Sequence, residues 1–471
     1  MRYRRFARSA FLISIALLAF IQPVAAKKGL KIEPGPKVMS AEEQAIREDP
    51  AAGVEHAVIL LEETLHNENL GPEMETRYHV RIKILSNEAR DLADIEIPLL
   101  SEDVKLSEWW GHVILPDGEV LELPKEKLEV QSLARVKRAE AKAYKAALPG
   151  VVPGCVIDYG YELRQQGYYP YDRITLQRRY LVREVNFRWI PTTWFQGAYY
   201  LSRTEGLDVQ ADVGRQEITI TGRNLPPVVE EPLMPPDHGV RAAVILYYLP
   251  VGMEFQDYWE DLATGVDRVL KMSAGKKSST QKLIAEMGLP EGSLDERLKA
   301  AYDWMGANIT RTGLRSFEQV EMDTEDDEKY KRDRIAALLK SREASQYEIH
   351  EVFVSVARAL GAEADLLYVA DRNEAYFNPN LKTASQFDSA LVAVRHKGAP
   401  DEKTVLLDLS SGLSYGEGPW WHMGTHGMLM QKSQPRVLPV PFGDGADSVS
   451  DVRLKLSFSE DNETILADWT Q

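Results

Sequence analysis

The stretch LLKSREASQYEIHEVFVSVARALG, residues 338–361, decides the fold of the second half of the chain. Its pattern predicts a loop that leads into an amphipathic helix. Gln346 and His350 are four residues apart, so they lie on one face of that helix. One residue along a helix turns a side chain by about 100°, so Ser345 points away from that face. The first turn of this helix is therefore the first candidate for a functional site.

The same stretch resembles the catalytic helix of the bacterial transglutaminase-like domains. In that family a Gly-Asp-Cys-x-Asp-His-Ala run is followed by Leu-Phe and by an Arg-Ala-x-Gly end. Residues 352–353 and 358–361, Val-Phe and Arg-Ala-Leu-Gly, match the second half of this pattern without a gap. Counting back from them places residues 344–350 under the first half. Gln346 then stands where the family has its nucleophilic cysteine.

Two segments further along the chain continue the resemblance. Residues 385–394, SQFDSALVAV, resemble the strand that reads Gln-Phe-Asn-His-Ala-Leu-Val in the family, and Ser389 stands in the place of the histidine base. Residues 405–409, VLLDL, resemble the following strand, whose aspartate is matched by Asp408. The resemblance therefore implies a vestigial triad of Gln346, Ser389 and Asp408, in which Asp408 has no imidazole to orient.

The residues in these positions lack the chemistry of the triad. A cysteine at a helix N-terminus attacks as a thiolate, which the helix dipole and a carboxylate-oriented imidazole favour. Gln346 neither ionises nor attacks a carbonyl, and the Ser389 hydroxyl does not act as a base near neutral pH. Losing one member of such a unit costs on the order of 10⁴- to 10⁶-fold in turnover. We therefore expect no catalytic residues here and predict a non-catalytic relative, a pseudoenzyme.

A rearranged active site is the alternative. Ser345, His350 and Asp408 would form a transglutaminase-like or cysteine-protease-like hydrolase or transferase if the backbone brought them together. His350 is more simply interpreted as a histidine that fills space or caps a polar pocket. The only cysteine, Cys155, lies in a strand-like stretch, so we expect a buried core thiol. The residues expected to line a ligand groove are Ser345, Tyr347, His350 and Asp388.

The composition is that of an ordinary globular protein. The chain has 471 residues, 44% of them hydrophobic and 27% charged, and this length predicts about three domains. The net charge of −16 argues against nucleic acid and anionic lipid as partners, since both attract clustered cations. We expect no cofactor. His422 and His426 form a His-x-x-x-His pair, but without a third ligand we expect no metal there.

Residues 1–26 have the pattern of a secretory signal peptide. Arginines precede an apolar run at 10–21, and Val-Ala-Ala at 24–26 offers a cleavage site. The apolar run is short for a membrane span, and no second run is long enough to cross a bilayer. We therefore expect an exported protein, periplasmic or extracellular, without a transmembrane segment after cleavage. Its single cysteine excludes an intramolecular disulfide.

Residues 54–223, after a lead-in at 27–53, show strand after strand. The run YHVRIKI at 78–84 alternates apolar and polar side chains, which predicts one buried face and one wet face. Hydrophobic runs on both sides of Pro-Asp-Gly at 116–118 predict a hairpin. We expect an antiparallel, β-sandwich-like domain. The runs at 80–85, 115–118 and 149–159 resemble the domain of unknown function that commonly precedes bacterial transglutaminase-like domains.

The remaining segments predict a multidomain chain. Residues 224–240 are a Pro-rich connector. Residues 241–435 show helical patterns followed by strand patterns, with a capping box at 293–296, and predict an α+β transglutaminase-like (papain-like) domain. The mixed-charge run at 318–334 is interpreted as a solvated loop. Residues 436–471 predict a C-terminal β-hairpin or the start of a further β domain.

These predictions favour an exported binding or scaffolding protein. It would recognise a peptide, a protein or a cell-wall component through the vestigial groove around Gln346. The rearranged enzyme is the first alternative, and a structural module of a secreted complex is the second.

Overall fold

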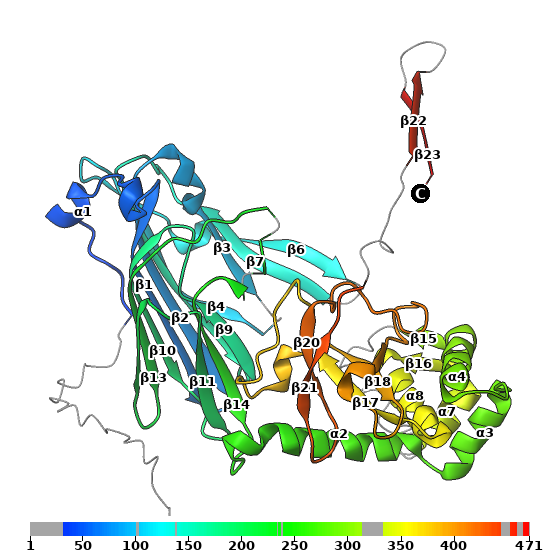
Figure 1. Ribbon diagram of the computed structural model, residues 1–471. Coiled ribbons are helices and arrows are strands. Elements are labelled where there is room, and N and C mark those ends of the chain that lie inside the picture. The colour runs from blue at the N-terminus through cyan, green and yellow to red at the C-terminus, as the bar shows by residue number, and fades with distance from the viewer. Residues whose placement is uncertain are drawn as a thin grey trace, which may run out of the picture.

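The structure, a computed structural model, is multidomain and rich in strands (Figure 1). It describes residues 32–99, 103–136, 139–232, 234–236, 239–312, 333–443, 453–458 and 465–470. The predicted signal peptide, almost all of the mixed-charge run and the tip of the C-terminal hairpin lie outside these residues. No helix of the described ranges is long and apolar enough to cross a membrane.

An eight-stranded sheet dominates the first half, in the order β12-β13-β10-β1-β2-β8-β4-β5. Its strands are β1 (Ala57–Leu70), β2 (Glu73–Ile84), β4 (Lys105–Ile114), β5 (Val120–Glu122), β8 (Val156–Gln166), β10 (Leu181–Ile190), β12 (Asp208–Val213) and β13 (Ile218–Leu225). The predicted hairpin at 116–118 joins β4 to β5. One pair departs from the predicted antiparallel order, because β1 and β10 run parallel. After β8 the chain leaves the large sheet to form β9 in another sheet. It then returns as β10, which pairs with the edge of β1 that β2 does not occupy.

Two three-stranded sheets accompany the large one, in the orders β11-β14-β9 and β3-β7-β6. Their strands are β3 (Asp94–Leu99), β6 (Glu129–Val136), β7 (Ala139–Ala147), β9 (Tyr171–Thr175), β11 (Gln196–Ser202) and β14 (Ala243–Leu249). A shared core contains the large buried side chains Phe187 and Trp189 of β10 together with Val244 and Leu246 of β14. β14 thus pairs with strands of the β-rich region, although it follows the predicted connector.

Both faces of β2 are buried, although the sequence predicted one wet face. His79 and Arg81 expose only 2% and 5% of their surface. His79 lies against Glu63, Asp158 and Trp110, and an N-terminal segment, residues 32–48, contacts Arg81. Arg81 donates hydrogen bonds to the Pro36 carbonyl and to Glu43. These contacts join residues 38 and 45 positions apart, so an alternation pattern within one strand could not reveal them. The prediction of a wet face was wrong for this reason.

Helices and a five-stranded sheet, in the order β19-β18-β17-β20-β21, form the second half. The helices are α2 (Tyr258–Ala274), α3 (Lys277–Met287), α4 (Leu294–Asn308), α7 (Arg334–Ser341) and α8 (Gln346–Leu360), and a short helix α1 (Ala41–Ala45) lies in the N-terminal segment. The strands are β15 (Thr310–Thr312), β16 (Glu343–Ser345), β17 (Glu363–Val369), β18 (Ser389–Arg395), β19 (Val405–Leu407), β20 (Thr425–Leu429) and β21 (Arg436–Val440). The capping box predicted at 293–296 is confirmed at the start of α4.

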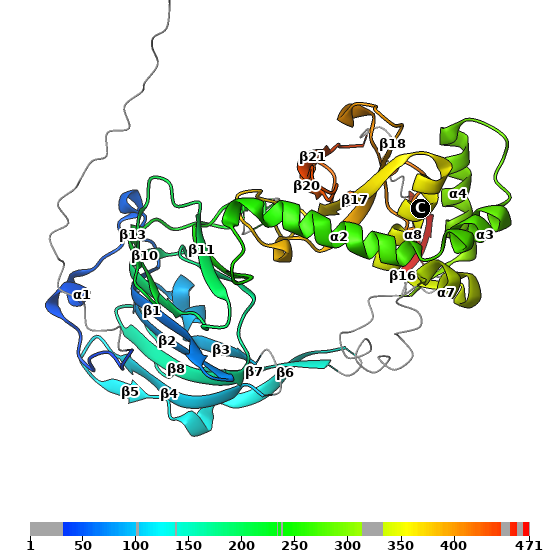
Figure 2. The same cartoon turned by 90° about the horizontal axis from the view of Figure 1, so that it is seen from below.

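Helix α8 is the central element of this α/β region. It packs against α2, α4, β17 and β18, and its buried side chains include Ile349, Val352 and Phe353. The helix ends at Gly361, whose φ of 105° lies in the left-handed region that glycine adopts without strain. Figure 2 shows α2 running from the β-rich region towards the other helices. Tyr247 of β14 and Leu381 pack in one cluster between the two regions.

Strands β22 (Arg453–Phe458) and β23 (Ile465–Thr470) pair with each other in an antiparallel hairpin. This confirms the strand pairing predicted at the C-terminal side of the chain. Their two-stranded sheet contains no other described strand.

Candidate functional site

The first turn of α8 holds the residues that the sequence singled out, and a capping box fixes it. Ser345 is the N-cap and Gln346 is the first helical residue. The Ser345 hydroxyl accepts a hydrogen bond from the Glu348 amide at 3.4 Å, and the Glu348 carboxylate accepts one from the Ser345 amide at 2.8 Å. This arrangement satisfies two backbone N–H groups that a helix start leaves without partners. The Ser345 hydroxyl is therefore engaged in the backbone of its own helix.

His350, one turn further along α8, is buried, with 2% of its surface exposed. Its Nε2 lies 3.0 Å from the Leu409 amide nitrogen and 3.3 Å from Asp408 Oδ1. One ring nitrogen cannot accept from an amide and donate to a carboxylate at once. The shorter contact is the one to Leu409, and that buried amide would otherwise lose its acceptor, so the geometry favours a neutral ring with its proton on Nδ1.

Asp408 is satisfied mainly by the turn that follows it. Its Oδ1 accepts from the Ser410 amide at 2.7 Å, from the Ser410 hydroxyl at 2.6 Å and from the Ser411 amide at 3.3 Å. These hydrogen bonds favour the charged carboxylate, so the oxygen that lies nearest to His350 is already satisfied by the turn. The sequence left Asp408 without an imidazole. The structure places one beside it, and this imidazole comes from α8 rather than from β18.

The β18 side of the predicted site is arranged differently. Ser389 is the first residue of β18 and the cross-strand partner of Val369, which packs in the cluster with Leu391. Val392 of the same strand packs in the other cluster, with the buried side chains of α8. Because side chains alternate along a strand, Ser389 and Val369 lie on the face turned away from α8. Among the described residues, no hydrogen bond joins Gln346 to Ser389 or to Asp408.

Tyr347 connects α8 to the segment before β18. Its hydroxyl donates to the Asp388 carbonyl oxygen at 3.0 Å, and the side chain is 40% exposed. Burial raises the pKa of Asp388, and its carboxylate accepts a hydrogen bond from the Asp371 amide. Tyr347 is thus a tethered aromatic ring that still faces solvent.

The rearranged triad is assembled only in part. His350 and Asp408 come together as that alternative requires. Ser345 does not join them, because its hydroxyl caps α8 and forms no hydrogen bond with His350 among the described residues. Within those residues His350 Nδ1 is buried and has no hydrogen-bond partner. A serine nucleophile needs a base within hydrogen-bond reach, and this pair does not provide one.

The other reactive side chains serve the fold. Cys155 is buried, and burial raises the pKa of its thiol, which makes it a poor nucleophile. His422 is buried and its Nδ1 lies 3.1 Å from the Ala370 carbonyl oxygen, whereas His426 is an exposed residue of β20. In the ranges that the structure describes, no three His, Cys, Asp or Glu side chains are grouped to hold a metal ion.

Two cavities lie in the β-rich region, at residues that the sequence did not single out. One, of about 470 Å³, lies between the large sheet and β9, and the other, of about 500 Å³, lies along β3, β6 and β7. Neither is lined by α8. The first contains Glu62, Thr64 and His66, which alternate along β1 in a run of 14 strand residues. These three polar residues on one face of a long strand are the sequence signal that could have indicated the cavity.

Comparison with known proteins finds a matching domain family in the β-rich region and a solved structure with a similar fold. Residues 73–229 match DUF3857, a domain of unknown function with a solved structure, which confirms the predicted presence of such a domain. The crystal structure of a candidate protease from Parabacteroides distasonis ATCC 8503 has a TM-score of 0.51 and 14% sequence identity, over 82% of this chain and 72% of that one. The shared fold therefore covers both the β-rich and the α/β regions.

Two further solved structures match less closely. A candidate cysteine protease from Cytophaga hutchinsonii has a TM-score of 0.22 and 9% identity, over 78% of this chain and 86% of that one. A TGase has a TM-score of 0.21 and 11% identity, over 50% and 53%. At such scores neither defines the function of this chain. No curated protein matches it.

Proposed function

We propose that this protein is an exported, non-catalytic relative of the transglutaminase-like proteins. We further propose that it binds a peptide-containing ligand through the surface at the start of α8. The ligand would be a polypeptide or the peptide part of a cell-wall component. The observation that carries the proposal is the state of the α8 N-terminus, where the first helical residue is a glutamine, Gln346, and the Ser345 hydroxyl caps the helix.

The charges around this helix start support binding rather than acyl transfer. The helix N-terminus attracts negative charge, and here Glu348 of the capping box already satisfies it. The neutral His350 ring accepts from the Leu409 amide and so has no lone pair left for a nucleophile. The Asp408 carboxylate is held by Ser410 and Ser411. Each group that could activate a nucleophile is engaged in a structural contact.

Tyr347 is the residue best placed to contact a ligand. A tyrosine ring offers apolar area together with a polar tip, and the bond to the Asp388 carbonyl holds this ring in place without covering it. Preorganised aromatic side chains lose little entropy on binding. Co-sedimentation with purified peptidoglycan sacculi, and separately with an immobilised denatured polypeptide, should therefore be weakened by Tyr347→Ala. Tyr376→Ala is the matched control, since Tyr376 is 46% exposed in the same α/β region.

The absence of catalysis is tested with the purified chain. Hydrolysis of a glutamine-containing peptide and its transamidation with a primary amine should stay at the uncatalysed rate. Turnover that disappears on Ser345→Ala or His350→Gln would overturn the proposal. That result would favour the second candidate, a rearranged hydrolase or transferase, for which the contact between His350 and Asp408 is the supporting observation.

The position of Gln346 has its own test. In a Cys155→Ala background, Gln346→Cys places a thiol at the first residue of α8, where the helix dipole should lower its pKa. The pH profile of its alkylation by iodoacetamide should lie about one unit or more below that of Tyr376→Cys, an exposed position outside any helix. Equal profiles would contradict the assignment of Gln346 to the vestigial nucleophile position.

A further inference from the structure

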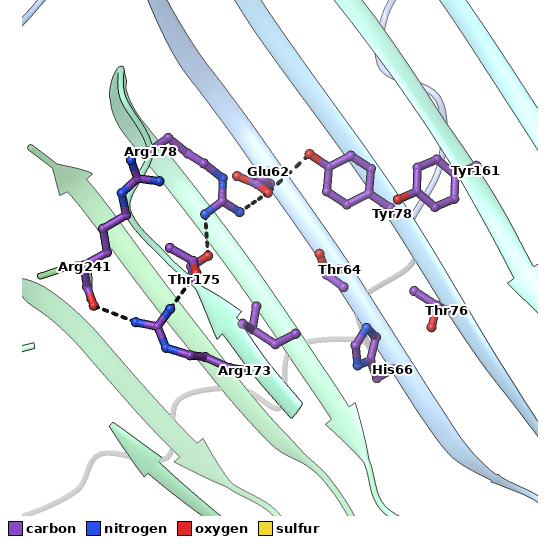
Figure 3. A pocket seen from close by; sticks show the side chains of 11 residues that line it. Glu62, Thr64, His66, Thr76, Tyr78, Tyr161, Arg173, Thr175, Arg178 and Arg241 are labelled. Carbon is purple, nitrogen blue, oxygen red and sulfur yellow. Dashed lines mark hydrogen bonds and ion pairs between the residues drawn. The ribbon is translucent and has the colours of Figure 1, made fainter. Parts of the chain in front are cut away.

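The cavity of about 470 Å³ in the β-rich region is lined mainly by polar side chains (Figure 3). One wall is the large sheet, where Glu62, Thr64 and His66 of β1 lie beside residues of β2 and β8. The other wall is β9 with the segments after it and before β14, and it contributes three arginines. Among the described residues that line the cavity, only Ile174 has a purely aliphatic side chain. Small-molecule sites typically measure about 300–1,000 Å³, so this polar space has the size of one.

The arginines of the second wall already have partners within the protein. Arg178 donates to Glu62 Oε1 at 2.5 Å, and Arg241 donates to the Glu230 carboxylate at 3.0 Å. Arg173 donates to a threonine hydroxyl of its own strand and to the Arg241 carbonyl oxygen, each at 3.2 Å. An anionic ligand would have to compete with these partners, and a cationic ligand would lie against three guanidinium groups. The charges of the cavity therefore favour a neutral ligand.

Two buried polar atoms of β1 on this cavity have no hydrogen-bond partner among the described residues. Glu62 is 3% exposed, and its Oε1 accepts from Arg178 and from the Tyr78 hydroxyl, whereas its Oε2 accepts from none of them. His66 is 6% exposed, and its Nδ1 lies 3.4 Å from the Asp172 carboxylate without a hydrogen bond. Burial lowers the pKa of His66 to about 4, so the ring is neutral at neutral pH. Buried polar atoms without partners are costly, and on a cavity wall they indicate a polar ligand.

The residues of β1 form a polar line along this wall. Thr64 lies between Glu62 and His66, and all three face the same side because side chains alternate along a strand. Thr76 of β2 is the cross-strand partner of His66. At roughly 3.4 Å per residue, the strand rises about 13 Å from Glu62 to His66, a length that two linked sugar rings can span. Hydroxyl groups both donate and accept, so a ligand with several hydroxyls can form hydrogen bonds along this line.

We propose that this cavity binds a neutral carbohydrate of disaccharide size, with one sugar hydroxyl donating to the Glu62 carboxylate and others bound by the Thr64 and Thr76 hydroxyls. A sugar hydroxyl supplies the donor that Glu62 Oε2 lacks, and it brings no charge to a wall whose cations have partners. The stacked rings of Tyr78 and Tyr161, with centroids 5.2 Å apart, offer an apolar surface to the C–H face of a sugar ring. The site does not depend on the function proposed for α8.

Titration calorimetry of the whole chain with cellobiose, maltose, lactose and trehalose tests the proposal. At least one of these neutral disaccharides should bind. Lactobionate, which is anionic, and the dimer of glucosamine, which is cationic at pH 6, should each bind at least ~10-fold more weakly than the best of them. No binding by any of the four up to tens of millimolar would overturn the proposal. Equal affinity for either charged disaccharide would overturn it too, and so would equal affinity for N-acetyl-alanine methylamide, a neutral peptide.

Substitutions then locate the site. Thr64→Val and Thr76→Val each remove one hydroxyl, keep every charge and introduce a residue that strands favour, so both chains should fold. Each should weaken disaccharide binding about 3- to 10-fold, and Glu62→Gln, which removes the charged acceptor, about 10- to 100-fold. Thr219→Val, at a half-buried position of β13 outside the cavity, is the matched control and should bind as the unaltered chain does. Unchanged affinity in both Thr64→Val and Thr76→Val would overturn the assignment, and these two variants decide the question if Glu62→Gln does not fold.

Discussion

Two buried histidines in this molecule lie at nearly the same distance from an aspartate, yet they do different things. His79 Nε2 is 3.2 Å from Asp158 in the β-rich region, and His350 Nε2 is 3.3 Å from Asp408 in the α/β region. His79 also contacts Glu63 through its other nitrogen, at 3.1 Å. Burial lowers the pKa of His79, but the hydrogen bonds and charges of Asp158 and Glu63 outweigh burial and raise this pKa to about 9. His79 is therefore a cation at neutral pH.

His350 belongs to a different kind of contact. Its Nε2 accepts from the Leu409 amide, and the oxygen that it faces already accepts from Ser410 and Ser411. The comparison teaches that the distance between a histidine and an aspartate does not define a catalytic or charged pair. What decides is the set of other donors and acceptors around each nitrogen and oxygen. By this criterion, His79 and Asp158 belong to an ion network that holds the N-terminal segment. His350 and Asp408 instead form a neutral contact that holds a turn.

Removing the Asp158 charge should give the largest effect. Asp158 is fully buried and accepts from His79, from Arg81 at 3.0 Å and from the Gly35 amide at 3.2 Å. Asp158→Asn leaves two buried cations with less compensation, so we expect a loss of about 3–5 kcal/mol in the stability of the β-rich region. Urea denaturation measures it, with the exposed Asp212→Asn as control. A loss below 1 kcal/mol would contradict a charged His79.

The pH dependence of stability should be the next largest effect. The pKa of His79 in the folded chain, about 9, lies above the ordinary value of 6.5. Between these values the folded state binds more protons than the unfolded state, so stability falls as pH rises. The contribution is fully present below pH 6.5 and is lost through pH 9. It amounts to about 3 kcal/mol.

Melting temperatures from pH 6 to pH 9.5 measure this slope. His79→Gln should flatten it, whereas His350→Gln should leave it in place. The other titratable and charged groups near His79 are Glu63, Arg81 and His112. Of these, Arg81 keeps its charge throughout the range. A slope that survives in His79→Gln would assign the titration to a different group.

Asp408→Asn should cost much less than Asp158→Asn. An asparagine oxygen can still accept from the Ser410 amide and hydroxyl, and no buried cation loses its partner if His350 is neutral. We expect a loss of about 1 kcal/mol, measured by urea denaturation of the α/β region. A loss as large as that of Asp158→Asn would show that His350 carries a charge.

Local patterns were sufficient to predict much of the fold. The helix at 346–360, the capping box at 293–296 and the strand at 78–84 each follow from residues close together in the chain. Contacts over long sequence separations escaped prediction. Arg81 is covered by residues 38–45 positions earlier, and His350 meets Leu409 across 59 positions. The cavity wall combines β1, β2, β8 and β9, so no single stretch could have revealed it.

The smallest effect distinguishes the two interpretations of Ser345 most directly. If this hydroxyl is only the N-cap of α8, Ser345→Ala should lower stability by about 1 kcal/mol, and Ser345→Asp, which also caps, should restore most of the loss. Hydrolysis of peptide amides should remain at the uncatalysed rate in all three chains. A nucleophile would give the opposite pattern, because aspartate would restore the helix but not the reaction. Stability and turnover measured on the same pair of variants therefore separate a structural serine from a catalytic one.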